Sequence, residues 1–357
     1  MGILGLGETW RRSRPVEPPV AKAPPAPARE SEKLPRRFGD FLLTSRVGSD
    51  ALGHVYRGLT LGETGDFVRV RLLDAPGLSR EQLAETIRTA PPPLRRTPAQ
   101  RPRGERLGLA RGTAFLSWNE MHGWTLDALF RDLRRRGRRL PVEHVLLIID
   151  GLAKALESGG PHGLVWPGFV SITRDGEARL GGFGLAPAIL PALDAGNLSA
   201  ALSPYMAPEA LEERTASADG DVYSLAAIAI EALTDHPTPF AGLGRGAGAD
   251  RLFPHDLARL LRTATGPRRQ RFATPGDFRR ELGQFMVGSG HLPSSFHFSR
   301  FLRDLDLPRE TASGARRTGT PAATEEDTAM PDVPVVPVLE EAEIESVLQK
   351  FWGQIDK

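Results

Sequence analysis

The sequence predicts an α+β fold in two parts, a strand-rich first part and a helix-rich second part. Short apolar segments bounded by Gly and Asp turn signals gather near the beginning of the chain. From Pro141 onward the apolar segments are longer, and they are apolar on all sides, as in buried helices. Regions rich in Pro, Ala and charge flank this unit, so we expect the folded part within residues 38–305.

The first part is expected to begin with the strands Phe41–Val47, Gly53–Leu59 and Phe67–Leu73. A helix is expected over Ser79–Arg88, because Ser79 followed three residues later by Gln82 matches a capping box. The proline run after this segment cannot continue a helix and ends it.

The second part is expected to contain two buried helices, Pro141–Glu157 and Val222–Leu233. Asp175-Gly176 between them is typical of the turn of a β-hairpin. Near the end of the chain, Leu339–Ile355 has apolar residues at helical spacing. These residues are Ile344, Val347, Leu348, Phe351, Trp352 and Ile355.

Composition excludes several classes of site. The chain has no cysteine, which excludes disulfides and thiolate metal sites, and none of its 8 histidines has a metal-ligand spacing. The formal net charge is +2. No segment approaches the roughly 20 apolar residues of a membrane helix, and Met1–Trp10 makes a poor signal peptide. We therefore expect a cytoplasmic protein, and the richness in Arg and Ala suits a bacterium of high GC content.

Several segments follow one another in the order and at the spacing of a known family. They are Arg46–Arg57, Pro161–Phe169, Leu180–Ala186, Tyr205–Glu209, Asp221–Leu225 and Arg268–Phe272. In this order they resemble the glycine-rich loop, catalytic loop, metal-binding motif, Ala-Pro-Glu motif, following helix and final arginine of Ser/Thr protein kinases. The resemblance covers about 38–285 and implies a two-lobed, protein-kinase-like fold.

The residues that the resemblance assigns to structure are retained. It implies a buried ion pair between Glu209 and Arg271, and hydrogen bonds from the catalytic-loop backbone to Asp221. It also implies that His162 and Phe183 stack between the lobes. Glu209→Ala is therefore expected to lower stability sharply.

The residues that the resemblance assigns to chemistry are replaced. Phosphoryl transfer in kinases uses a strand lysine, a catalytic acid and two metal ligands. Arg71 stands at the lysine, Leu164 at the catalytic Asp, Phe169 at the metal-binding Asn and Gly182 at the metal-binding Asp. Leu164→Asp is expected to change stability very little. The resemblance thus implies a degenerate member of the family, a pseudokinase, with no metal site.

Two alternatives concern acidic residues. Asp150 or Asp175 would supply the missing acid if the alignment had slipped, but correctly spaced flanking residues argue against a slip. Glu85 is a candidate partner for Arg71, and Glu81 fits almost as well, although both suit a solvated helix face.

The expected nucleotide site is also altered. Gly48 and Gly53 occupy the first and third glycine positions of the glycine-rich loop, while Asp50 stands at the second. Arg69 and Arg71 point to the same face of their strand, because strand side chains alternate. By the resemblance this face is the roof of the adenine pocket, where Arg69 would take the space of the ring. We therefore expect neither a nucleotide nor any other cofactor.

Composition, periodicity and the resemblance together give the domains as follows: 1–37, a disordered Pro/Ala-rich segment; 38–290, a pseudokinase domain with lobes at about 38–120 and 121–290; 291–309, a helical extension; 310–336, a disordered linker; 337–357, an amphipathic helix.

The function predicted is that of an inactive kinase-like domain that binds, scaffolds or regulates proteins in bacterial signalling. The alternatives are a weak or unconventional Ser/Thr kinase or ATP-binding protein, and an arginine-rich adaptor for nucleic acid. The run Arg134–Arg139 is better interpreted as a solvated loop than as a nucleic-acid footprint, since aromatic residues are not interleaved with it. No small-molecule substrate is predicted.

Protein partners are expected at the C-terminal helix. Its apolar face includes the candidate partner-binding residues Val347, Leu348, Phe351 and Trp352. An isolated helix of this length is marginal in water, so it needs a surface to fold against. That surface is either a groove of another protein or the chain's own domain, and the long tether favours another protein.

Overall fold

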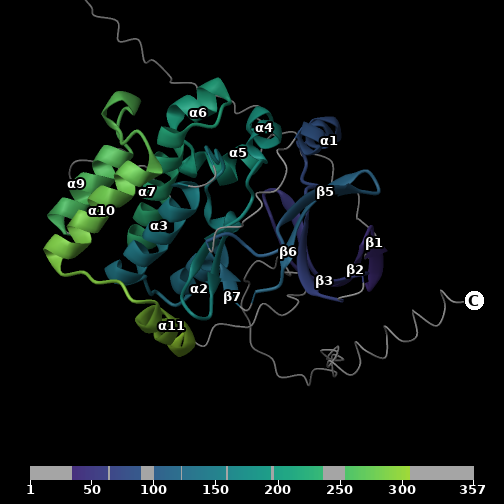
Figure 1. The fold of residues 1–357 in the computed structure, drawn as a ribbon, viewed down its shortest axis with the longest axis horizontal. Helices are drawn as coiled ribbons and strands as arrows, with labels where there is room; N and C mark the ends of the chain where they lie inside the picture. Colours follow the sequence, from purple (N-terminus) through teal and green to yellow (C-terminus); the bar gives the residue numbers. More distant parts are fainter. Residues whose placement is uncertain are drawn as a thin grey trace, which may run out of the picture. The chain divides into compact units, whose positions relative to one another are not determined.

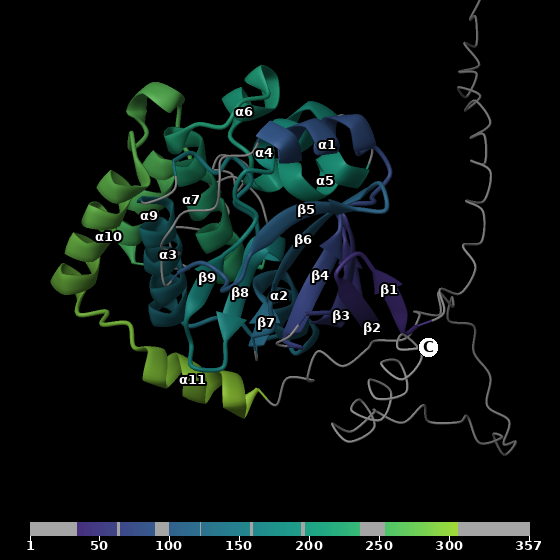
Figure 2. The same ribbon diagram turned by 45° about the vertical axis from the view of Figure 1, so that its right-hand side comes forward.

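The computed structural model describes residues 34–62, 65–89, 100–121, 123–157, 160–193, 197–235 and 254–305. Within them the fold has two parts, a sheet built from β1–β6 and a mainly helical part, with the small sheet β7–β9 between the two (Figures 1 and 2). The two-lobed α+β prediction is confirmed. The expected helix Leu339–Ile355 and its candidates Val347, Leu348, Phe351 and Trp352 lie outside the described residues.

The first part is a six-stranded antiparallel sheet with the strand order β1-β2-β3-β4-β6-β5. Its strands are β1 Arg36–Phe38, β2 Phe41–Asp50, β3 Gly53–Thr60, β4 Phe67–Leu72, β5 Arg106–Ala110 and β6 Thr113–Asn119. The three predicted strands are confirmed as β2, β3 and β4. The strands β1, β5 and β6 were not predicted, and β1 begins within the stretch expected to be disordered.

One helix, α1 (Arg80–Thr89), joins β4 to β5 and lies beside α4 (Figure 2). Its predicted N-cap is present, because the Ser79 hydroxyl accepts a hydrogen bond of 3.2 Å from the Gln82 backbone N–H. The side chain of Leu83 is buried against the main core. The helix prediction is therefore confirmed to within one residue at each end.

The two faces of the large sheet differ in chemistry. One face is apolar and forms a core of its own from Phe38, Phe41, Leu43, Tyr56, Val68, Val70, Leu72 and Phe115. The other face carries the alternate residues of the same strands, among them Arg69 and Arg71 of β4. Since side chains alternate along a strand, this second face turns away from that core. It carries these arginines beside apolar residues such as Leu116, and we call it the charged face.

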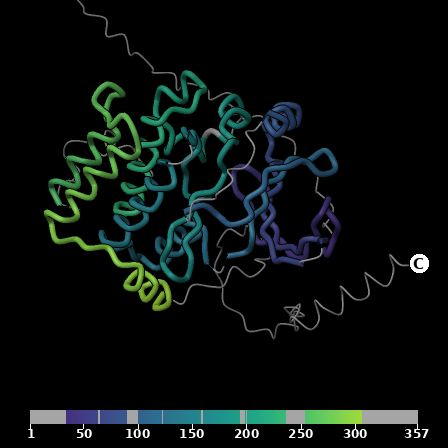
Figure 3. The backbone as a smooth tube through the Cα atoms, viewed as in Figure 1, coloured from purple at the N-terminus to yellow at the C-terminus, as the bar shows by residue number. Residues whose placement is uncertain are grey.

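The second part is helical. Its helices are α2 Leu126–Arg135, α3 Val142–Glu157, α4 Ala186–Ile189, α5 Asn197–Leu202, α6 Pro208–Glu213, α7 Ala218–Thr234, α9 His255–Ala264, α10 Pro275–Ser289 and α11 Ser295–Asp304. Its 3-10 turns are η1 Pro167–Phe169, η2 Leu190–Ala192, η3 Ser203–Tyr205 and η5 Arg268–Gln270. The trace in Figure 3 follows these helices from the small sheet to α11.

The helix α7 is the centre of this part. It begins at the cap Ser217, whose hydroxyl accepts from the Gly220 N–H, and it contacts α3, α9 and α10. Nearly all of its side chains are buried, as its apolar surroundings require. Both predicted buried helices are confirmed as α3 and α7. No helix among the described residues is long and apolar enough to span a membrane.

The small sheet consists of β7 Gly123–Thr125, β8 Val170–Thr173 and β9 Ala178–Leu180. The predicted hairpin turn at Asp175-Gly176 joins β8 to β9, and Gly176 has φ +78°. A Cβ at Gly176 would lie 2.6 Å from the Ser295 carbonyl oxygen, so the glycine permits the close approach of α11.

Candidate functional site

The charged face of the large sheet is occupied by a buried arginine. The side chain of Arg71 is 2% exposed, and its guanidinium forms an ion pair of 2.6 Å with Asp50. It also donates a hydrogen bond of 2.9 Å to the Gly168 carbonyl of η1. Its Cζ lies 5.8 Å from the ring centre of Trp118 and 4.9 Å from that of Phe169. Arg71 therefore joins the two parts of the fold.

The partner Asp50 lies where β2 turns tightly into β3. The Asp50 carboxylate accepts from the Leu52 N–H at 2.9 Å as well as from Arg71. Leu52 at the tip of the turn is fully buried in the main core. Gly53 has φ +139°, and a Cβ there would lie 2.2 Å from the Leu72 carbonyl oxygen. The turn is thus folded down onto the protein, and Gly48 lies at a register shift just before it.

Arg69 is also paired internally. Its guanidinium lies 3.0 Å from the carboxylate of Glu120, which follows β6. Arg57, directly opposite Arg69 in the sheet, reaches the same carboxylate at 2.7 Å. Arg69 and Arg71 share one face, as expected. The space beneath that face holds ion pairs of the chain's own side chains.

Neither helix glutamate binds Arg71. Glu85 forms an exposed ion pair of 2.7 Å with Arg88, and the Glu81 carboxylate accepts a hydrogen bond from Ser79. Asp50 at the end of β2 supplies the carboxylate partner that was expected from the helix. The positive charge of Arg71 is therefore neutralised by a carboxylate of the same sheet.

Phe169 and Gly182 lie together beneath Arg71. Phe169 is buried, and a Cβ built on Gly182 would lie 2.7 Å from its ring. Gly182 has φ +86°, a conformation that glycine adopts without strain. The side chains at these two positions have no oxygen atom, and hard cations need oxygen ligands. Among the described residues no group of three or more His, Asp or Glu side chains is placed to hold a metal.

Leu164 is 1% exposed, and its backbone N–H donates to Nδ1 of His162 at 3.1 Å. The expectation that Leu164→Asp would scarcely alter stability is at odds with this burial. A carboxylate placed here loses its hydration, which costs free energy unless new hydrogen-bond donors compensate.

A segment that the sequence analysis did not single out contacts the Gly182 region. The carboxylate of Glu105 accepts a hydrogen bond of 2.5 Å from the Gly182 N–H. Burial raises the pKa of Glu105 from its ordinary 4.5 to about 7, although that hydrogen bond and the charges of Arg101 and Arg71 oppose the rise. Arg101 lies over the Phe183 ring, 3.4 Å from its centre.

His162 and Phe183 are in contact as predicted, but edge to face instead of stacked, with ring centres 4.5 Å apart and planes at 71°. The Nε2–H of His162 donates to the Gly181 carbonyl at 2.9 Å, while Nδ1 accepts from Leu164. Complete burial lowers the pKa of His162 to about 4. The imidazole is therefore neutral at physiological pH, and both of its nitrogens are used in structure.

Asp221 at the start of α7 accepts hydrogen bonds from the backbone of the loop that contains His162, as predicted. Its two carboxylate oxygens accept from the N–H groups of His162 at 2.7 Å and Gly163 at 2.8 Å. Burial raises the pKa of Asp221 to about 7 against the effect of these two hydrogen bonds. The loop is therefore held rigidly against the central helix.

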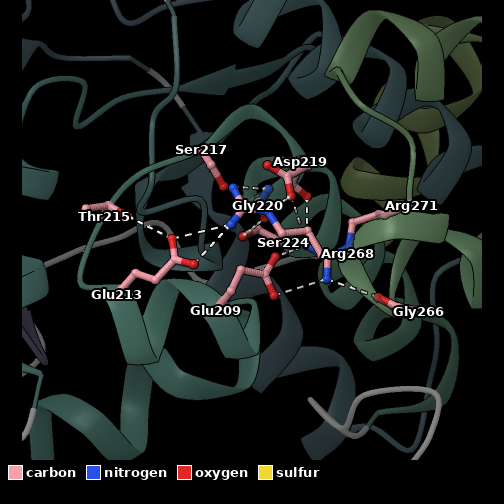
Figure 4. Close-up of polar contacts among 10 residues, drawn as sticks. All are labelled: Glu209, Glu213, Thr215, Ser217, Asp219, Gly220, Ser224, Gly266, Arg268 and Arg271. Carbon is pink, nitrogen blue, oxygen red and sulfur yellow. Dashed lines mark hydrogen bonds and ion pairs between the residues drawn. The ribbon is translucent and has the colours of Figure 1, made fainter.

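The predicted pair of Glu209 and Arg271 is present at the centre of a larger network (Figure 4). Arg271 also donates to the carbonyls of Asp219 at 3.1 Å and Gly266 at 3.0 Å. Beside it, Arg268 joins Asp219 and the exposed Glu213. The network ties α6 to the start of α7 and to η5.

The alternative acids lie elsewhere. Asp150 pairs with Arg279 of α10 at 2.8 Å, and Asp175 lies exposed in the hairpin turn. Much of the arginine run Arg134–Arg139 is also paired. Arg134 binds Glu231, Arg135 and Arg136 bind Asp132, and Arg139 binds Asp235. Its positive charge is thus partly neutralised.

The register of the sheet contains the signal that sequence reasoning missed. Gly48 faces Val55, which faces Arg71, so these residues share one side of the sheet. Asp50, two residues beyond Gly48, is on that side too. Asp50 and Arg71 lie on β2 and β4 with β3 between them, so the long Arg71 side chain reaches Asp50 across β3. No comparable pattern marks Arg101 or Glu105, which lie outside regular structure.

The fold and the retained contacts define a class. An antiparallel sheet with one helix precedes a helical part, and His162, Phe183, Asp221, Glu209 and Arg271 make the contacts expected of the kinase fold. The protein therefore has the protein-kinase fold.

Comparison with known proteins agrees with this class. The chain is 29% identical over 223 residues to the serine/threonine-protein kinase PknL of Mycobacterium bovis, covering 60% of this chain and 53% of PknL. It is 33% identical over 138 residues to the serine/threonine-protein kinase PknA of Mycobacterium tuberculosis, covering 37% of this chain and 31% of PknA. The chain thus spans about half the length of the first relative and about a third of the second. No protein-family model matches.

A solved structure gives the same result for the fold. A doubly substituted form of the Mycobacterium tuberculosis PknI kinase domain superposes with a TM-score of 0.53 and 23% identity, covering 70% of this chain and 97% of that domain. The chain thus has the protein-kinase fold, and over part of its length its sequence is similar to bacterial Ser/Thr protein kinases.

Proposed function

We propose that this chain is a kinase-like protein that does not transfer phosphate and acts by binding other proteins, as a scaffold or regulatory module. The observation that carries the proposal is the buried pair of Arg71 and Asp50. A nucleotide bound against this face of the sheet would have to displace a guanidinium that is bound to a carboxylate, a carbonyl and two aromatic rings. Breaking a buried ion pair leaves uncompensated charge and costs about 3–5 kcal/mol.

Three further features support the proposal. Arg69 and Glu120 fill the neighbouring part of the sheet face with a second ion pair. Leu164 has no group that accepts a proton from a substrate hydroxyl, which a general base must do. The side chains at Phe169 and Gly182 have no carboxylate or amide oxygen for a magnesium ion. We assign these positions to the degenerate kinase site, together with Gly48 and Gly53.

A weak or unconventional Ser/Thr kinase is the second candidate, because the relatives PknL and PknA are named as kinases. An active kinase would need the Arg71–Asp50 pair to open. The two candidates therefore differ in nucleotide binding as well as in phosphate transfer.

The decisive measurement is thermal unfolding of the full chain with ATP and magnesium. A ligand at a hundredfold excess over its Kd stabilises a protein by about 2.7 kcal/mol, which raises Tm by several degrees. We expect no rise at millimolar ATP. Asp50→Ala and Arg71→Ala variants, measured alongside, show whether opening the pair creates a nucleotide site.

Phosphate transfer is measured in parallel with radiolabelled ATP, to the protein itself and to generic protein substrates. We expect transfer at the level of the Arg71→Ala variant. Transfer by the parent that Arg71→Ala abolishes would establish the kinase alternative and overturn the proposal.

A further inference from the structure

A short segment before β5, residues 100–105, crosses from the first part of the fold onto the second. At its beginning the Gln100 carbonyl accepts a hydrogen bond of 2.8 Å from the Leu180 N–H. At its end the Glu105 carboxylate accepts from the Gly182 N–H at 2.5 Å. The segment thus bonds to two backbone donors that lie two residues apart at the end of β9.

Between these hydrogen bonds the segment packs closely. Pro102 is buried, and a Cβ on Gly181 would lie 3.2 Å from its Cγ. The same Cβ would lie 2.8 Å from a carboxylate oxygen of Glu105. A side chain at position 181 would have to displace the Glu105 carboxylate and crowd Pro102.

The segment also contacts the Phe183 ring. Arg101 places its guanidinium 3.4 Å from the centre of that ring, which is the geometry of a stacked cation–π contact. His162 contacts the same ring from the second part, with centres 4.5 Å apart. Phe183 is therefore held by one residue from each part of the fold.

We propose that residues 100–105 form an intramolecular strap that holds Gly181–Phe183 in place without a bound ligand. Hydrogen bonds, close backbone packing and a cation over a ring all join the same two short segments. The strap fixes how the first part lies on the second, because it ends directly before β5 of the large sheet. The proposal stands whether or not the protein transfers phosphate.

Hydrogen exchange followed by mass spectrometry on the full chain tests the strap. Peptides spanning residues 178–185 contain both backbone donors that the strap accepts from. Glu105→Ala removes one acceptor and Arg101→Ala removes the contact with Phe183. We expect either change to accelerate exchange in these peptides roughly five- to tenfold, as for the loss of one buried hydrogen bond.

Two matched variants sharpen the test. Glu105→Gln keeps an oxygen that can accept from Gly182 and is expected to retain protection. Arg103→Ala removes an exposed cation of the same segment and is expected to exchange like the parent. Peptides from α7, residues 222–232, report on global stability.

Two results would overturn the proposal. One is exchange at the parent's rate in peptides 178–185 of both Glu105→Ala and Arg101→Ala. The other is an equal acceleration in the α7 peptides, because a strap acts locally whereas general destabilisation affects the whole fold.

Discussion

Arg71 and Arg271 have closely similar surroundings in different regions of the molecule. Each side chain is at most 2% exposed and forms an ion pair with one carboxylate, Asp50 or Glu209. Each also donates to backbone carbonyl oxygens and lies over an aromatic ring. Arg271, however, joins segments within the helical part, whereas Arg71 joins the sheet to the helical part.

Each arginine has a second carboxylate nearby, Asp219 for Arg271 and Glu105 for Arg71, and the pKa values of these two groups shift in opposite directions. Asp219 lies 3.9 Å from Arg271. Burial opposes its ionisation, but hydrogen bonds from Ser217 and Arg268 outweigh burial and lower its pKa. Burial dominates for Glu105 near Arg71 and raises its pKa to about 7. Hydrogen bonds therefore hold the second carboxylate near Arg271 in its ionised form, whereas burial favours the protonated form of the one near Arg71.

The largest effect is expected at Glu209. Glu209→Ala leaves the Arg271 guanidinium buried without its carboxylate, at a cost of about 3–5 kcal/mol in the free energy of unfolding. Denaturant titration of the full chain measures this loss. Glu213→Ala is the matched control, because the Glu213 carboxylate pairs with exposed Arg268 and is itself half exposed. Exposed pairs contribute at most about 1 kcal/mol. Equal stabilities of the two variants would contradict the buried network.

A smaller effect is expected at Asp50. Asp50→Ala removes the carboxylate of Arg71, but the turn at Asp50 can relax and admit water, so we expect a loss of about 2–3 kcal/mol. Adding Arg71→Met should restore part of the loss, since an apolar side chain can replace a buried charge. Denaturant titration of the single and double variants gives the coupling energy. If the double variant is no more stable than Asp50→Ala, then the buried Arg71 guanidinium costs little free energy without its carboxylate, and the prediction is wrong.

A third effect concerns pH. The Glu105 carboxyl holds its proton up to about pH 7 in the folded chain, but only to its ordinary 4.5 in the unfolded chain. Folding therefore takes up a proton between these values. The resulting stability is fully present below pH 4.5 and is lost as pH rises through 7.

Glu105→Gln should therefore make the fall in stability between pH 5 and pH 8 shallower. The remaining slope belongs to groups such as Asp221, whose pKa is also raised to about 7. Thermal unfolding across this range is the measurement. A slope unchanged by the substitution would mean that Glu105 is ionised in the folded protein throughout.

The two arginine sites also show how far sequence reasoning reaches. The partner of Arg271 was predicted because both residues lie in motifs at fixed spacing. The partner of Arg71 was not, because it depends on the register of β2, β3 and β4 and on a turn folded inward. Glu105 and Arg101 reach their contacts through an irregular segment, and such paths leave no periodic pattern in a sequence.

The surroundings of Gly182 oppose the return of an acidic side chain at this position. On the proposed function an acidic residue was lost at this position. A Cβ at 182 would now lie 2.7 Å from the Phe169 ring, and the backbone conformation of φ +86° disfavours any side chain. Gly182→Asp alone would meet both obstacles before any metal could bind, so Phe169 would have to change first. Each step of such a path would lower stability before it gained activity, and selection would act against the return.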